Sequence, residues 1–131
     1  MKNPIGSLSF VLYALIAVSP VGTAADRVHS GEWETTVDAG GRSRVMKSCV
    51  TPAEAEVMNG DERMLREGIE KATAGTGCKV TAVKSSGNQV TVSTQCASST
   101  NTGTTTYRGD SYDAENTNGT KVHAKRVGAC P

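Results

Sequence analysis

Cysteine and histidine are the residue types in this sequence that are best suited to chemistry. The residues are Cys49, Cys78, Cys96, Cys130, His29 and His123. A thiol nucleophile needs a neighbouring histidine that lowers its pKa, whereas redox motifs, haem attachment and structural zinc sites need closely spaced pairs such as C-x-x-C. The sequence contains no such pair. We therefore expect no catalytic residue, no metal site and no cofactor, and we interpret the cysteines as structural.

A candidate binding surface comes from the aromatic residues and one histidine. Its members are Trp33, Tyr107, Tyr112 and His123. Trp33 suits either the core or a pocket for a small lipid-like ligand. His123 alternates with Lys125 in a predicted strand, which indicates a solvent-facing position rather than a catalytic one.

Hydroxyl side chains form a second candidate surface. Thr91, Ser93 and Gln95 alternate along one predicted strand, and Thr104 and Thr106 alternate along another. A flat threonine ladder is able to order water or bind carbohydrate. Such ladders are more often the outer face of an antiparallel sheet, where β-branched polar residues are favoured, and we prefer that interpretation.

The first 25 residues have the layout of a secretory signal peptide. A positive start at Lys2 is followed by an apolar run over residues 8–18, by Pro20 and by small residues up to Ala25. The apolar run is too short for a membrane-spanning helix, which needs about 20 residues. We expect residues 1–25 to be cleaved and residues 26–131 to form one domain, periplasmic or secreted and without a membrane span.

The charge balance of the exported part excludes two classes of partner. Lys2 is one of the 14 basic residues of the chain, and all 13 acidic residues follow the signal peptide, so residues 26–131 have a formal net charge of zero. Nucleic acids and anionic membranes select proteins with a basic surplus. We expect neither as a partner.

The first predicted elements are two paired strands and a helical segment. Residues 31–37 alternate between apolar and polar side chains, and a turn at residues 38–41 leads to a second strand over residues 43–50. Thr51, Pro52 and Glu54 then form a helix-start signal, because Thr51 and Glu54 are spaced to cap each other's backbone. We predict a break at residues 59–60 and a second helical piece that Asp61 caps.

The remainder of the chain is predicted to be antiparallel β structure. Strands over residues 79–85 and 89–96 flank a hairpin turn. Polar strands follow over residues 102–108 and 111–117, and a second turn leads to residues 120–127. The predicted fold is therefore α+β: an antiparallel sheet of six or seven strands, a meander or a partly closed barrel, packed on one helical segment.

Two disulfides are expected, because an even number of cysteines in a small exported chain indicates a disulfide framework. The hairpin turn places Cys78 opposite Cys96, and a helical segment that crosses the sheet once would place Cys49 at the other end, near Cys130. This favours the pairs Cys78–Cys96 and Cys49–Cys130. Pairs Cys49–Cys78 and Cys96–Cys130 remain open, since a helical segment that folds back on itself would produce them.

Several stretches together resemble a known family. They are G-E-W-E-T-T, C-V-T-P-A-E-A, the hairpin C-K-V-T-A-V-K-S-S-G-N-Q-V-T-V-S-T-Q-C and the ending R-V-G-A-C-P. This order is similar to exported bacterial proteins of the family domain of unknown function 3617. The resemblance implies a secreted or periplasmic protein of a Gram-negative bacterium, and it carries over no catalytic residue, cofactor or substrate.

The function expected from the sequence is a non-enzymatic binding module for a small ligand or another envelope protein, and we expect a monomer. The alternatives are an enzyme or enzyme accessory with a polar site, and a structural or stress-related envelope protein. A cavity lined by Trp33 and valines would favour binding. Polar side chains converging on His123 would favour an enzyme, and a filled core with a featureless surface would favour the structural role.

Overall fold

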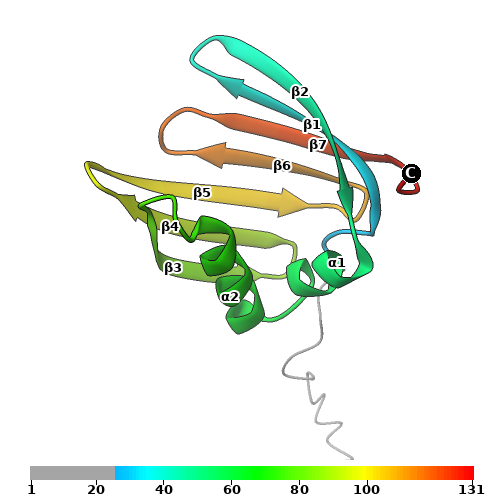
Figure 1. The fold of residues 1–131 in the computed structure, drawn as a ribbon, viewed down its shortest axis with the longest axis horizontal. Helices are drawn as coiled ribbons and strands as arrows, with labels where there is room; N and C mark the ends of the chain where they lie inside the picture. The colour runs from blue at the N-terminus through cyan, green and yellow to red at the C-terminus, as the bar shows by residue number, and fades with distance from the viewer. Residues whose placement is uncertain (1–25) are drawn as a thin grey trace, which may run out of the picture.

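A computed structural model describes residues 26–131 of the chain (Figure 1). The predicted signal peptide, residues 1–25, lies outside the described residues. The strands are β1 (Gly31–Ala39), β2 (Arg42–Val50), β3 (Lys79–Ser86), β4 (Gln89–Cys96), β5 (Ser99–Tyr107), β6 (Ser111–Asn116) and β7 (Lys121–Gly128). The helices are α1 (Pro52–Met58) and α2 (Glu62–Thr73), which lie between β2 and β3 in the chain.

The seven strands form one antiparallel sheet in the order β2-β1-β7-β6-β5-β4-β3. The predicted fold class is confirmed, and the sheet is open, with β2 and β3 at its two edges. The connection between these edges crosses one face of the sheet and carries both helices. In Figure 1, α2 lies in front of β3 and β4, and most of β1, β6 and β7 is uncovered on this face.

The helices begin where the sequence predicts. Thr51 and Glu54 form a reciprocal capping box at the start of α1, and the Asp61 side chain accepts the backbone N–H of Met64 at the start of α2. The predicted break at residues 59–60 separates them. Each cap satisfies backbone N–H groups that a helix start leaves without a partner, which fixes these two boundaries locally.

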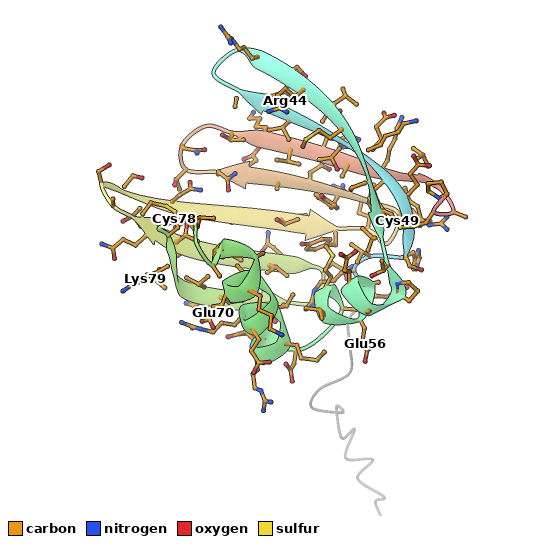
Figure 2. The ribbon with its side chains drawn as sticks, viewed as in Figure 1. Arg44, Cys49, Glu56, Glu70, Cys78 and Lys79 are labelled. Carbon is orange, nitrogen blue, oxygen red and sulfur yellow. A yellow bond between two sulfur atoms is a disulfide. The ribbon has the colours of Figure 1, made fainter. Side chains whose placement is uncertain are left out.

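The preferred disulfide pairing is confirmed: Cys49 is bonded to Cys130 and Cys78 to Cys96. Figure 2 shows Cys49 and Cys78 at opposite ends of the sheet, as a helical segment crossing it once requires. A β-bulge between Val80 and Ala82 shifts the register of the β3–β4 hairpin by one residue. The bulge brings Cys78 level with Cys96, although the hairpin turn alone would set a different register.

The buried side chains form two clusters on the helix face of the sheet. Val28, Trp33, Ala55 and Ala124 form the first cluster, which joins the start of the described chain to α1. The second consists of Leu65, Val83 and Val90 and joins α2 to the β3–β4 hairpin. Tyr107 packs against both clusters. The clusters hold the two helices over one half of the sheet.

None of the helices within residues 26–131 is long and apolar enough to cross a membrane. The two disulfides are consistent with an oxidising compartment, where such bonds form and persist.

Candidate functional site

An apolar groove of about 680 Å³ lies between the helices and the sheet. Its apolar lining comes from α1, α2 and strands β2, β4 and β5. The apolar residues of this lining are Val50, Ala53, Val57, Met58, Leu65, Ile69, Ala72, Val90, Val92 and Tyr107. The groove is concave, large enough for a small molecule, and bordered by few polar groups. This chemistry suits a hydrocarbon chain.

Small residues on the two helices keep the groove open. Ala53 of α1 and Gly68 and Ala72 of α2 face it, where larger side chains would fill it. Gly68 also lets the helices approach each other, because a Cβ atom at this position would lie 2.7 Å from Cγ1 of Val57. The apolar stripe of α2 therefore does more than bury a core, since part of it lines an accessible groove.

Of the described residues that line the groove, two are charged, Glu54 and Lys71. The Glu54 carboxylate accepts the backbone N–H of Thr51 at 2.9 Å, so its charge takes part in the capping box of α1. Lys71 has no ion pair or side-chain hydrogen bond with any residue in the range 26–131. Burial raises the pKa of the Tyr107 hydroxyl, so this groove-lining residue is neutral at physiological pH. The free charge of the groove is thus positive.

The segment that leads into β1 is anchored to the end of α1 and to the β3–β4 turn by a buried arginine. Arg27 is 3 % exposed. Its guanidinium donates to the backbone carbonyls of Gly87, Met58 and Gly60 at 3.1, 3.1 and 2.8 Å. Met58 is the last residue of α1, Gly60 lies just after it, and Gly87 lies in the β3–β4 turn. One side chain therefore links the segment before β1 to the end of α1 and to this turn. Sequence reasoning missed this residue, because a single arginine ahead of the first predicted strand gives no periodic signal.

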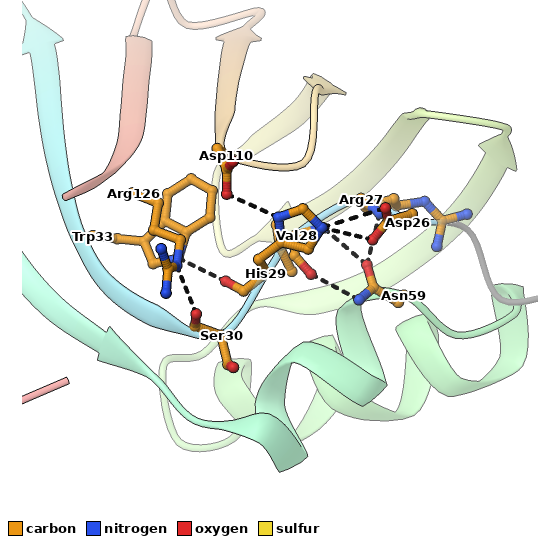
Figure 3. Close-up of polar contacts among 9 residues, drawn as sticks. All are labelled: Asp26, Arg27, Val28, His29, Ser30, Trp33, Asn59, Asp110 and Arg126. Atoms are coloured by element: carbon orange, nitrogen blue, oxygen red, sulfur yellow. Dashed lines mark hydrogen bonds and ion pairs between the residues drawn. The ribbon is translucent and has the colours of Figure 1, made fainter. Parts of the chain in front are cut away.

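Asn59, which ends α1, holds the same segment by its side-chain amide (Figure 3). Its Oδ1 accepts the backbone N–H groups of Arg27 and Val28, and its Nδ2 donates to the Val28 carbonyl at 2.8 Å. The amide therefore acts like an added strand partner. Residues that follow the predicted cleavage site are in this way fixed to the helix that borders the groove.

His29 forms a polar cluster with two carboxylates (Figure 3). Its Nδ1 lies 2.8 Å from Asp110, and its Nε2 lies 3.1 Å from Asp26. The hydrogen bond with Asp110, followed by that with Asp26, raises the pKa of His29 above its ordinary value of 6.5. The cluster is exposed and joins the segment before β1 to the turn between β5 and β6. It does not line the groove.

A second histidine cluster lies on the face of the sheet away from the helices. His123 Nδ1 is 2.6 Å from Asp113, which also pairs with Arg108. The hydrogen bond from His123, and then that from Arg108, lowers the pKa of Asp113. Polar side chains do converge on His123, but all three are about half exposed on an outer face rather than in a cleft.

The candidate binding surface predicted from the sequence divides into two parts. Trp33, Tyr112 and Tyr107 lie together, with ring centroids 5.6 Å apart for the first pair and 5.4 Å for the second. Trp33 is 2 % exposed and belongs to the core, whereas Tyr107 lines the groove. Tyr112 pairs with Ala124, and the next pair along β6 and β7 is Asp113 with His123. Successive pairs point to opposite faces of a sheet, so His123 lies on the face opposite the tyrosines. The aromatic row leads from the core to the groove.

The predicted threonine ladder lies on the outer face too. Thr91 and Thr104 pair across β4 and β5, as do Ser93 and Thr102, and their hydroxyls are 3.3 and 3.0 Å apart. The hydroxyls therefore bond to one another. Within residues 26–131 there is also no group of three or more His, Cys, Asp or Glu side chains able to hold a metal ion.

Comparison with known proteins assigns a family to this architecture. The family described as "Protein of unknown function (DUF3617)" matches residues 28–130, a range that runs from buried Val28 to disulfide-bonded Cys130. No curated protein and no solved structure matches the chain. The match covers the whole sheet, both helices and the groove, and it confirms the resemblance that the sequence indicated. The chain therefore belongs to the DUF3617 family.

Proposed function

We propose that this protein is a non-enzymatic binding protein whose groove holds the hydrocarbon chain of a small amphiphile. The observation that carries the proposal is the apolar groove of about 680 Å³ between the helices and the sheet. Sites for small molecules have volumes of about 300–1,000 Å³ and are mostly apolar with few polar groups. The groove has both properties, and the small helix residues that face it leave its volume unfilled.

The charge at the groove favours an anionic head group. Within residues 26–131 its lining contains one basic residue, Lys71, and one acidic residue, Glu54, whose carboxylate is engaged in the capping box. A fatty acid or another single-chain anion would place its chain against Ile69 and Val92 and its head near Lys71. The ligand class is thus a single-chain amphiphile with one negative charge.

The compartment we propose is the periplasm of a Gram-negative bacterium, or the extracellular space. Support comes from the signal peptide that residues 1–25 predict and from the two disulfides, which suit an oxidising compartment. A carrier for an apolar molecule has an evident use in an aqueous compartment next to membranes. We expect it to work as a monomer with no cofactor.

An enzymatic role is the second candidate, and the cluster of His123, Asp113 and Arg108 is the observation in its favour. We prefer binding because this cluster lies on an exposed face, opposite the groove. The substitution His123→Ala separates the two roles, since it would leave amphiphile binding unchanged if the groove is the site.

Displacement of a fluorescent fatty acid from delipidated protein tests the proposal. Palmitate should displace the probe, and each methylene added between laurate and palmitate should tighten binding by up to about fourfold, because more apolar surface is buried. The methyl ester of palmitate should bind more weakly than the acid. Lys71→Gln should remove that difference and leave the dependence on chain length unchanged.

A groove-filling variant provides the structural control. Ala72→Trp places an indole in the groove and should weaken palmitate binding at least about tenfold. Arg63→Trp adds the same ring to α2 at a position that is 84 % exposed and outside the groove, and it should bind palmitate as the wild type does. Equal binding by both variants would exclude the groove as the site.

A further inference from the structure

The two edge strands of the sheet, β3 and β2, differ in how far the rest of the molecule covers their outer backbone groups. At the β3 edge, the Glu62 side chain of α2 accepts the Ser85 N–H at 3.2 Å, and Arg66 of α2 donates to the Val80 carbonyl at 3.4 Å. A bulge between Val80 and Ala82 further interrupts this edge. Such features prevent an edge strand from pairing with another chain. The β3 edge is therefore blocked.

The β2 edge has no comparable cover. Among the strands of residues 26–131, β2 pairs with β1 alone, and every residue from Arg42 to Cys49 is exposed. Between Ser43 and Lys47, no hydrogen bond from the described part of the chain reaches the outer side of this strand. Figure 2 shows Arg44 on this uncovered strand, away from both helices. The β2 edge is thus open over residues 43–47, about half of the strand.

The register of the hairpin identifies the free backbone groups. Gly40 and Gly41 form a two-residue loop with φ angles of 58° and 77°, which is the geometry of a type I′ turn. In such a hairpin Ala39 and Arg42, which flank the loop, are a hydrogen-bonded pair, and the pairing repeats every second residue. The N–H and C=O groups of Ser43, Val45 and Lys47 consequently point away from β1.

The side chains of β2 indicate what kind of strand would fit beside it. Arg42, Arg44 and Lys47 give the strand three positive charges and it contains no acidic residue. No carboxylate of residues 26–131 lies within 4.0 Å of these three groups. Val45 and Met46 are 62 % and 45 % exposed and point to opposite faces of the sheet. A membrane surface would contact one of these faces, whereas an added strand would contact both.

Self-association is disfavoured by the same charges. Two β2 edges would bring six positive charges together, and β3 also carries Lys79 and Lys84 with no acidic residue. Like charges on neighbouring strands are destabilising. A strand from a second copy is therefore a poor match for this edge.

We propose that the β2 edge of this protein binds an extended acidic segment of a partner protein by strand addition. The segment would hydrogen-bond to the outward groups of Ser43, Val45 and Lys47. Its acidic side chains would lie next to Arg42, Arg44 and Lys47, and its apolar side chains would cover Val45 and Met46. This mode of recognition combines main-chain affinity with side-chain specificity. The proposal is independent of the groove.

A peptide designed from the register tests this proposal. In the antiparallel orientation the complement of residues 42–47 reads Glu-Val-Val-Glu-Thr-Glu from its N-terminus, and the control is Lys-Val-Val-Lys-Thr-Lys. In fluorescence anisotropy with the protein, we expect the acidic peptide to bind and the lysine control peptide not to bind. We also expect the acidic peptide to slow amide hydrogen exchange at Val45 and Lys47, whose N–H groups face outward. Binding of both peptides alike, or exchange rates that do not change, would overturn the proposal.

Variants separate strand addition from other uses of this strand. Val45→Pro removes an outward N–H that has no partner within residues 26–131, so the fold should persist while peptide binding weakens about tenfold. Val45→Thr keeps the N–H and should bind as the wild type does. Arg44→Glu combined with Lys47→Glu should reverse the preference to the basic peptide. Unchanged peptide binding by Val45→Pro would contradict the proposal. A dimer that forms through β2 would also contradict it. So would binding of the protein to anionic vesicles that Val45→Pro does not weaken.

Discussion

At the scale of single residues, the Arg27 side chain does most to hold the segment before β1 in place. It is nearly fully buried, and its charge is compensated by backbone carbonyls instead of a carboxylate. Burying a charge is costly unless hydrogen bonds replace its hydration. Together with Asn59 it fixes the start of the described chain to the end of α1.

Arg27→Ala should lower the free energy of unfolding by about 2–4 kcal/mol, because it leaves three carbonyls without a donor and opens a cavity. Chemical denaturation monitored by Trp33 fluorescence measures this loss. Arg63→Ala is the matched control: its pair with Glu67 is exposed, and its removal should cost less than about 0.5 kcal/mol. Similar losses in the two variants would show that the carbonyl contacts contribute little.

The His29 cluster gives a dependence on pH. Because the folded pKa of His29 is raised, the stability that its protonation contributes is fully present below 6.5 and is lost as pH rises through the folded pKa. Asp110→Asn should lower this pKa toward 6.5 in an NMR titration of the imidazole. Asp113→Asn, which changes the carboxylate beside His123, should leave the His29 titration unaltered. An unchanged His29 pKa in Asp110→Asn would contradict the assignment.

At the scale of elements, local signals carry most of the information in the sequence. The capping box at Thr51 and Glu54 and the Asp61 cap depend on residues within one helical turn, so both helix starts could be predicted. Strand alternation and turn residues identified the strands for the same reason. Near its turn the β3–β4 hairpin pairs Ser86 with Gln89 across two residues, a register one residue away from the one that places Cys78 opposite Cys96. The bulge at residues 80–82 restores that alignment, and it could not be predicted because it has no distinct sequence signal.

The two disulfides should contribute unequally to stability. In the chain-entropy description, a bridge stabilises more when it closes a longer loop of the unfolded chain. The Cys49–Cys130 bridge spans 81 residues and should contribute about 4.5 kcal/mol, against about 3.2 kcal/mol for Cys78–Cys96, which spans 18. Thermal unfolding of the paired serine variants measures both values. A larger loss on removing Cys78–Cys96 would show that strain or residual structure outweighs chain entropy.

At the scale of the whole molecule, the crossing of the helices from one sheet edge to the other creates the groove. That arrangement depends on packing between residues far apart in the chain, such as Leu65 with Val83 and Val90, which form one buried cluster. The apolar stripe of α2 was visible in the sequence, but whether its residues fill a core or line a groove depends on how closely the helix approaches the sheet. The groove therefore could not be predicted, although a pocket for a lipid-like ligand was among the expectations.

The open β2 edge belongs to the same scale. The two edge strands differ because α2 side chains and a bulge block the β3 edge, whereas no helix within residues 26–131 hydrogen-bonds to residues 43–47 of β2. A molecule with a groove at one end and an open edge at the other is able to hold a ligand and contact a protein at the same time. The substitutions in the groove and those at Val45 should consequently have independent effects on the two binding reactions.

The central claim is that the groove holds the chain of an amphiphile, and intermolecular NMR contacts test it most directly. Protein with labelled methyl groups is mixed with palmitate, and nuclear Overhauser effects between the two are recorded. We predict contacts from the palmitate chain to the methyl groups of Ile69 and Val92 in the groove and none to Val127, which is exposed. Contacts confined to exposed residues such as Val127, or no contacts at all, would contradict the account.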